Sequence, residues 1–63
     1  MMLRHEKICT QHAYIEVLLI KVVESYIVIE SMAALDGKSK YADTDIYYDI
    51  TEANQRFDHI VNS

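Results

Sequence analysis

The spacing of apolar residues in this chain changes from a strand-like period to a helical one just after Asp49. Before that point, rows of β-branched and aromatic residues flank Asp36-Gly37, which contains the only glycine. Such residues favour strands, because branched side chains pack well on a pleated surface. The order of these patterns predicts an α+β fold, a small three-stranded antiparallel β-meander followed by one C-terminal helix packed on one sheet face (β-β-β-α).

The length of 63 residues allows a single domain. Its core must be small, because a chain of this size buries only about 60% of its unfolded surface. We expect residues 1–12 to form an N-terminal arm, since they lack a sustained period, and residues 13–63 to form the domain. A buried helix over residues 13–23 stays open as an alternative to the first strand, because short apolar runs are ambiguous.

Two reversals set the expected register. Glu24-Ser25 is expected to form a two-residue loop with Val23 opposite Tyr26, and Asp36-Gly37 suits the next loop because Asp-Gly favours hairpin turns. Side chains alternate along a strand, so these registers sort the sheet into two faces. The expected core face carries Leu18, Ile20, Val22, Ile27, Ile29, Ala42, Thr44, Ile46 and Tyr48.

The expected helix begins after Asp49, which can cap it, and Glu52 follows three positions later in an acidic variant of the capping box. Its apolar residues recur at helical spacing and form one stripe. The stripe consists of Ala53, Phe57, Ile60 and Val61. Phe57 is expected at the centre of the core.

One helix covers one side of a sheet, so the opposite face is expected to stay open. In the expected register Glu30 lies opposite Asp43, and like charges in that position destabilise a sheet. A basic partner, a bound cation, Lys21 or a different register could compensate, and a solvated acidic edge is a further alternative. The predicted partner-binding residues are Tyr26, Glu30, Tyr41, Asp43, Asp45, Tyr47 and Asp49.

The other half of that face is apolar and is expected to form a homodimer interface, because contiguous exposed apolar patches commonly mark interaction surfaces. The predicted interface residues are Ile15, Val17, Leu19, Val28 and Met32. A small domain needs support from disulfides, a metal or self-association. Because Cys9 is the only cysteine, an intrachain disulfide is impossible.

Charge and hydropathy exclude several classes of partner. The chain has six Lys and Arg against ten Asp and Glu, a net charge of −4, whereas nucleic acid is bound mainly through Lys and Arg. The longest apolar run, residues 17–20, is too short for a bilayer, and no signal peptide is visible. We therefore expect no direct nucleic-acid or membrane binding. A lone cysteine fits the cytoplasm, of the cell or of an infected host.

Two further functions have little support in the sequence. His5, Cys9 and His12 are spaced to share one side of a helix and are weak candidates for a zinc site, although structural sites usually have four protein ligands. No arrangement of nucleophile, base and pocket is recognisable. We expect no catalysis and no cofactor.

These features predict a small non-enzymatic protein-binding module that uses its acidic, tyrosine-bearing face on a basic protein surface. In general character, small, acidic and glycine-poor, the chain resembles the inhibitor proteins of phages and mobile elements, including anti-CRISPR proteins. The resemblance implies inhibition of nucleic-acid-handling machinery by phosphate mimicry. A structural homodimerising subunit without external ligand, and a metal-binding module based on the N-terminal His, Cys and His, are the alternatives.

Overall fold

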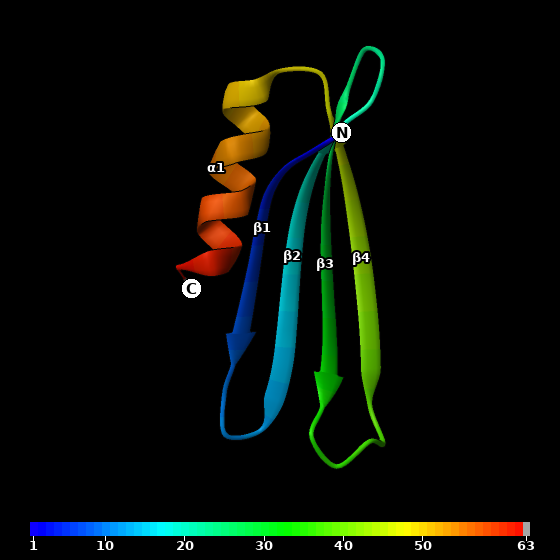
Figure 1. The fold of residues 1–63 in the computed structure, drawn as a ribbon, viewed down its shortest axis with the longest axis vertical. Coiled ribbons are helices and arrows are strands. Elements are labelled where there is room, and N and C mark those ends of the chain that lie inside the picture. The colour runs from blue at the N-terminus through cyan, green and yellow to red at the C-terminus, as the bar shows by residue number, and fades with distance from the viewer. Residues whose placement is uncertain (63) are drawn as a thin grey trace.

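The computed structural model describes residues 1–62. It shows an antiparallel sheet of four strands in the order β1-β2-β3-β4, followed by one helix (Figure 1). The elements are β1 Met2–Cys9, β2 Ala13–Lys21, β3 Tyr26–Ala34, β4 Lys40–Tyr47 and α1 Ile50–Val61. The α+β class and the C-terminal helix are confirmed, whereas the predicted number of strands is one too low.

The missing strand is β1, which occupies most of the predicted N-terminal arm. It pairs with β2 from Met2 opposite Ile20 to Cys9 opposite Tyr14. Thr10 shapes the reversal, because its hydroxyl oxygen accepts a hydrogen bond of 2.9 Å from the Ala13 amide. An edge strand is held by backbone hydrogen bonds to one neighbour. Few apolar side chains are needed for that, which is why the composition of residues 1–12 was misleading.

The β2–β3 connection is longer than predicted. Lys21, not Val23, lies opposite Tyr26, and the Val22 amide closes the loop by donating to the Ser25 carbonyl oxygen at 3.0 Å. The pairing is therefore shifted by two residues. An even shift leaves every side chain on its predicted face, and the strand itself rules out the alternative helix over residues 13–23.

The β3–β4 register is confirmed, including Glu30 opposite Asp43. The loop has four residues instead of two, because the Ala34 amide donates to the Ser39 carbonyl oxygen at 2.8 Å. Asp36-Gly37 lies at the centre of this loop, so the added residues are shared equally between its two sides. Gly37 has φ of 75°, a left-handed conformation that costs a glycine little.

Helix α1 has the predicted cap and stripe. The Asp49 carboxylate accepts a hydrogen bond of 2.7 Å from the Thr51 amide, and Ala53, Phe57 and Ile60 are buried. The helix packs against β2, β3 and β4. It lies along the half of the sheet nearest the β4–α1 connection and leaves the other half bare (Figure 1).

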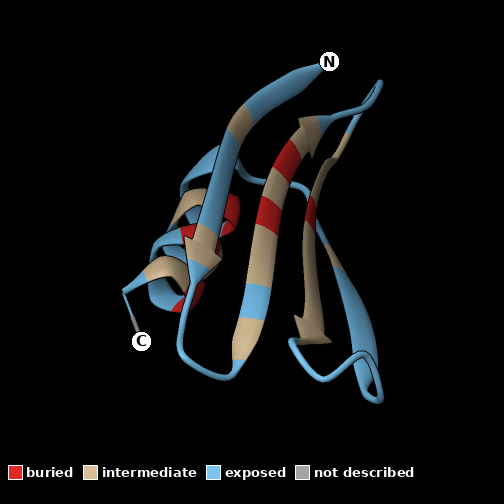
Figure 2. Ribbon diagram, turned by 60° about the horizontal axis from the view of Figure 1, so that its bottom comes forward, coloured by how far each residue is buried: buried red, intermediate tan, exposed pale blue. Residues whose placement is uncertain are grey.

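The core lies on the face opposite to the one predicted. Val17, Leu19 and Val28 meet the helix stripe, and the three strand residues are at most 1% exposed. Figure 2 shows the buried segments, which lie on α1, β2 and β3. Alternation assigns side chains to two faces but does not say which face the helix covers. Both faces are apolar here, and the short connection after Tyr47 determines which of them α1 covers.

Candidate functional site

An acidic cluster, defined as Glu30, Tyr41 and Asp43, lies on the helix-bearing face outside the hydrophobic core. Glu30 and Asp43 are directly opposite each other on β3 and β4. The Tyr41 hydroxyl donates a hydrogen bond of 2.9 Å to Glu30 Oε1. Tyr41 is 45% exposed, so the cluster presents an aromatic ring and two carboxylates to solvent.

The phenol of Tyr41 reports the negative potential of this cluster. Its pKa is raised above the ordinary value, first by the hydrogen bond to Glu30, then by partial desolvation and the charges of Glu30 and Asp43, against a smaller opposing effect of Arg56. A hydrogen bond donated to a carboxylate holds the phenolic proton in place. The hydroxyl is therefore a donor throughout the physiological range.

Arg56 of α1 is the cation that acts on the acidic cluster, and it forms a salt bridge with Asp45. Arg56 Nε lies 3.2 Å from Asp45 Oδ2. Within residues 1–62, neither Glu30 nor Asp43 forms a salt bridge. The like-charge pair expected from the register is thus present, and it has no ion-pair partner in the described part of the chain.

The other predicted partner-binding residues have structural roles. Tyr26 and Tyr47 face each other across β3 and β4 and pack, partly buried, against the core. Asp49 caps α1, and Asp45 holds Arg56. Of the seven predicted partner-binding residues, the three of the acidic cluster therefore remain as candidates.

The predicted dimer interface is largely inside the molecule, which corrects that prediction. Val17, Leu19 and Val28 are buried by α1, and Ile15 packs partly buried against the same core. Met32 is half-buried on β3. Val17, Leu19, Val28 and Ile15 are on the predicted face, but the helix packs on them, so these four are not available as an exposed surface.

The candidate zinc ligands do not converge. His5 and Cys9 lie on a strand and not on a helix, where four residues span about 13 Å. His5 Nε2 lies 2.7 Å from Glu16 Oε2 instead, and His12 is exposed in the β1–β2 loop. Among residues 1–62, no three His, Cys, Asp or Glu side chains are grouped to hold a metal ion.

Sequence reasoning missed the face of the sheet that is opposite to α1. We call it the open face, and its bulky end is a strip of branched aliphatic residues with no charged side chain among them. This strip consists of Leu18, Ile20, Ile27, Ile29 and Ile46. Ile46 is 58% exposed and the others are partly exposed. The signal was in the sequence, because these residues alternate with the core residues, but they were assigned to the core.

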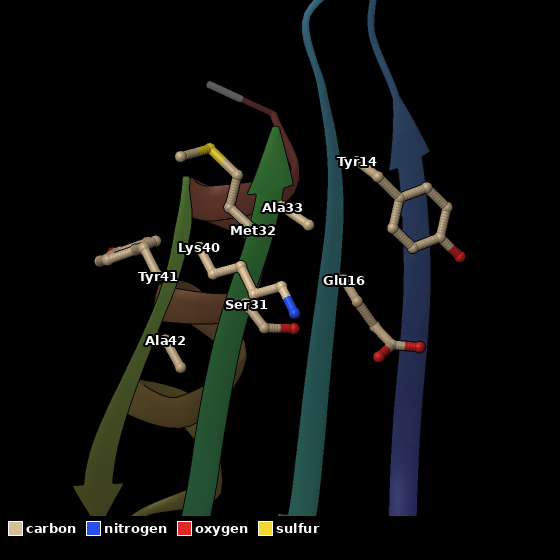
Figure 3. Close-up of a pocket in the computed structure, with 8 residues that line it drawn as sticks. All are labelled: Tyr14, Glu16, Ser31, Met32, Ala33, Lys40, Tyr41 and Ala42. Carbon is tan, nitrogen blue, oxygen red and sulfur yellow. The ribbon is translucent and has the colours of Figure 1, made fainter. Parts of the chain in front are cut away.

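The other end of the open face is hollow. A depression of about 470 Å³ lies over the small residues Ser31, Ala33 and Ala42. Tyr14 and Glu16 line it on β2, and Lys40 lies on β4 with its side chain extending across β3 toward Ser31 (Figure 3). This hollow end is shallow and open to solvent.

Comparison with known proteins gave no significant match to a protein-family model, to a curated protein or to a solved structure. Within residues 1–62, no helix is long and apolar enough to cross a membrane. The acidic cluster and the open face are therefore the two surfaces from which a function can be inferred.

Proposed function

We propose that this chain is a small non-enzymatic protein-binding module that acts as a homodimer and binds a basic protein surface through its acidic cluster. The observation that carries the proposal is the placement of Glu30 directly opposite Asp43 without a salt bridge in residues 1–62. Like charges in that position cost stability. A Lys or Arg from a partner would neutralise the two carboxylates, and relief of their repulsion would then add to the free energy of binding.

The surroundings of the two carboxylates suit such a side chain. Tyr41 offers an exposed ring edge and face for the aliphatic stem or the cation. Half-buried Met32 lies opposite Tyr41 and adds apolar contact. The net charge of −4 favours encounter with a basic protein.

The same chemistry supports an inhibitor of nucleic-acid-handling machinery. Two adjacent carboxylates can occupy a site that otherwise binds phosphates, since both are recognised by Arg and Lys. We assign this role to Glu30 and Asp43, because Asp45 and Asp49 are engaged within the chain. Mimicry of this kind is the specific form of the proposal.

Self-association is the second part of the proposal. Within residues 1–62, the buried core consists of six residues, and domains of this size commonly depend on additional support. The exposed aliphatic strip of the open face supplies a surface for it. A homodimer without any external ligand is the competing function, and the experiment below separates the two.

The test is quantitative affinity capture from the native cell with three forms of the tagged chain. The wild type is compared with the Glu30→Gln/Asp43→Asn variant and with Glu24→Gln/Glu52→Gln, which removes two negative charges elsewhere. We expect a basic protein to be enriched by the wild type and the control, and its affinity for the cluster variant to fall by on the order of tenfold or more.

Recovery that is equal for all three forms would exclude the acidic cluster as the binding site. Failure to enrich any protein above a tag-only control, combined with a dimeric mass, would favour the structural homodimer. Gel-shift measurements with DNA and RNA complete the set, because the proposal expects no direct binding to either.

A further inference from the structure

We infer that two copies pack through their open faces with strands reversed, so that the bulky end of each copy fills the hollow end of the other. This inference rests on the homodimer of the proposed function and adds its surface and its arrangement. The interface is then isologous, as in most two-fold dimers.

The side-chain volumes along β3 carry the argument. Its open-face positions are, in order, Ile27, Ile29, Ser31 and Ala33, so volume falls from one end of the strand to the other. The two-fold axis lies between the two sheets, parallel to both and perpendicular to the strands. It passes over β3 between Ile29 and Ser31 and so exchanges the two ends of the strand. Ile29 then lies over Ser31 of the second copy and Ile27 over its Ala33. Alternating large and small residues lets two facing layers interdigitate.

The other axis between the two sheets, parallel to the strands, fails on the same volumes. It would set bulky end on bulky end and would leave the two hollows of about 470 Å³ facing each other. Unfilled space at an apolar contact loses packing energy. The reversed arrangement instead sets Ile27 and Ile29 of each copy over the small β3 residues that floor the hollow of the other.

Polar groups are placed where a dimer would leave them in water. His5 and Lys7 lie on the edge strand β1. Lys40 is the first residue of β4, and its side chain, which crosses β3 toward Ser31 (Figure 3), has to turn outward to the rim when a second copy packs there. Glu16 is the exception, because it lies on the inner strand β2, but its carboxylate contacts His5 at 2.7 Å. An apolar centre with a polar rim is the usual anatomy of an interface.

The area of the open face is adequate for a dimer. Strands of eight or nine residues, four side by side at the usual spacings, give a face of roughly 500 Å². Two such faces bury at most about 1,000 Å² together, which is the size that a biological interface has to reach with good complementarity. The result is an eight-stranded sandwich with the helices outside.

The reversed arrangement makes one contact that can be tested by charge. On β4, Lys40 and Ile46 are at opposite ends of the strand on the open face, so the axis brings Ile46 of one copy near Lys40 of the other. A positive charge at position 46 then meets a positive charge, and a negative one meets its complement. In the dimer whose axis is parallel to the strands, Ile46 does not meet Lys40, so a positive and a negative charge at position 46 have similar effects.

The experiment is sedimentation equilibrium over the micromolar range, with folding checked by circular dichroism. The wild type is expected at twice the 7.3 kDa chain mass. Ile46→Lys should weaken the dimer by on the order of 100-fold and Ile46→Glu by about tenfold or less. Ala42→Arg, which fills the hollow, should also weaken it. Val23→Lys is the control, because Val23 is 95% exposed in the β2–β3 loop.

The outcomes separate the inference from the proposed homodimer. A wild type that stays monomeric removes both. A dimer weakened equally by Ile46→Lys and Ile46→Glu overturns the reversed arrangement and keeps the homodimer. A dimer insensitive to Ile46→Lys and Ala42→Arg shows that another surface is used, which overturns the inference.

Discussion

The guanidinium carbon of Arg4 lies 4.1 Å from the centroid of the Phe57 ring, so the edge strand β1 contacts the centre of the core through a cation. The same side chain donates to Asn54 Oδ1 at 2.8 Å and forms a salt bridge of 2.9 Å with Asp58. These contacts join β1 directly to α1 on the helix-bearing face of the sheet. They explain why a strand with little apolar content is ordered.

Replacing Arg4 with Ala should lower the free energy of unfolding by about 2 kcal/mol, the combined size expected for a cation–π contact and a partly exposed ion pair. Arg4→Lys should recover part of the loss, because Lys keeps the charge but not the planar fork. Urea unfolding measures both. Lys7→Ala on the same strand is the control, and a loss of similar size there would contradict the assigned role.

Removing either member of the like-charge pair should stabilise the chain. Glu30→Gln and Asp43→Asn are each expected to raise the free energy of unfolding by about 0.5 kcal/mol, because they end the same repulsion. The double variant should gain less than the sum, and the gain should shrink in high salt. Additive gains, or gains that salt leaves unchanged, would show that the two carboxylates do not repel each other.

The raised pKa of Tyr41 predicts a loss of stability at alkaline pH. The folded chain holds the phenolic proton more tightly than the unfolded chain, whose tyrosines have a pKa of about 10. The contribution is therefore fully present below the unfolded pKa and is lost as the pH rises through the folded pKa. An NMR titration of the tyrosine rings measures this. In Glu30→Gln the pKa should move toward the ordinary value.

The β3–β4 loop should be sensitive at Gly37 for backbone reasons alone. Its φ is 75°, and no atom lies within 4 Å of the position a Cβ would take. Gly37→Ala should therefore cost about 1 kcal/mol through conformation and not through a clash. Gly37→Asn should cost less, since Asn tolerates the left-handed region. Thermal unfolding compares both with Lys38→Ala in the same loop, which should be nearly neutral.

Features governed by local chemistry could be predicted from the sequence. The alternation of side chains, the Asp36-Gly37 loop, the Asp49 cap and the stripe containing Phe57 each depend on a few neighbouring residues. The β3–β4 register was correct although the loop is longer than predicted, because the added residues are symmetric about Asp36-Gly37. Glu30 and Asp43 were found in this way.

The choice of covered face was not a local property. Leu18 and Leu19 are equally apolar, and only the path of the chain after Tyr47 places α1 over Leu19. Charge pairs could have indicated the side, because Arg56 matches Asp45. Strand β1 was missed for a related reason, since its stabilising contacts come from Arg4 and from backbone pairing instead of an apolar period.

The meander order has a consequence for how quickly the molecule forms. Each strand pairs only with its neighbours in the chain, so the sheet can assemble from successive hairpins with small loops to close. Low mean sequence separation between contacting residues correlates with fast folding. The exceptions join the two ends of the chain, such as Arg4 with Asn54, fifty positions apart. Helix docking, and not strand pairing, should therefore limit the folding rate.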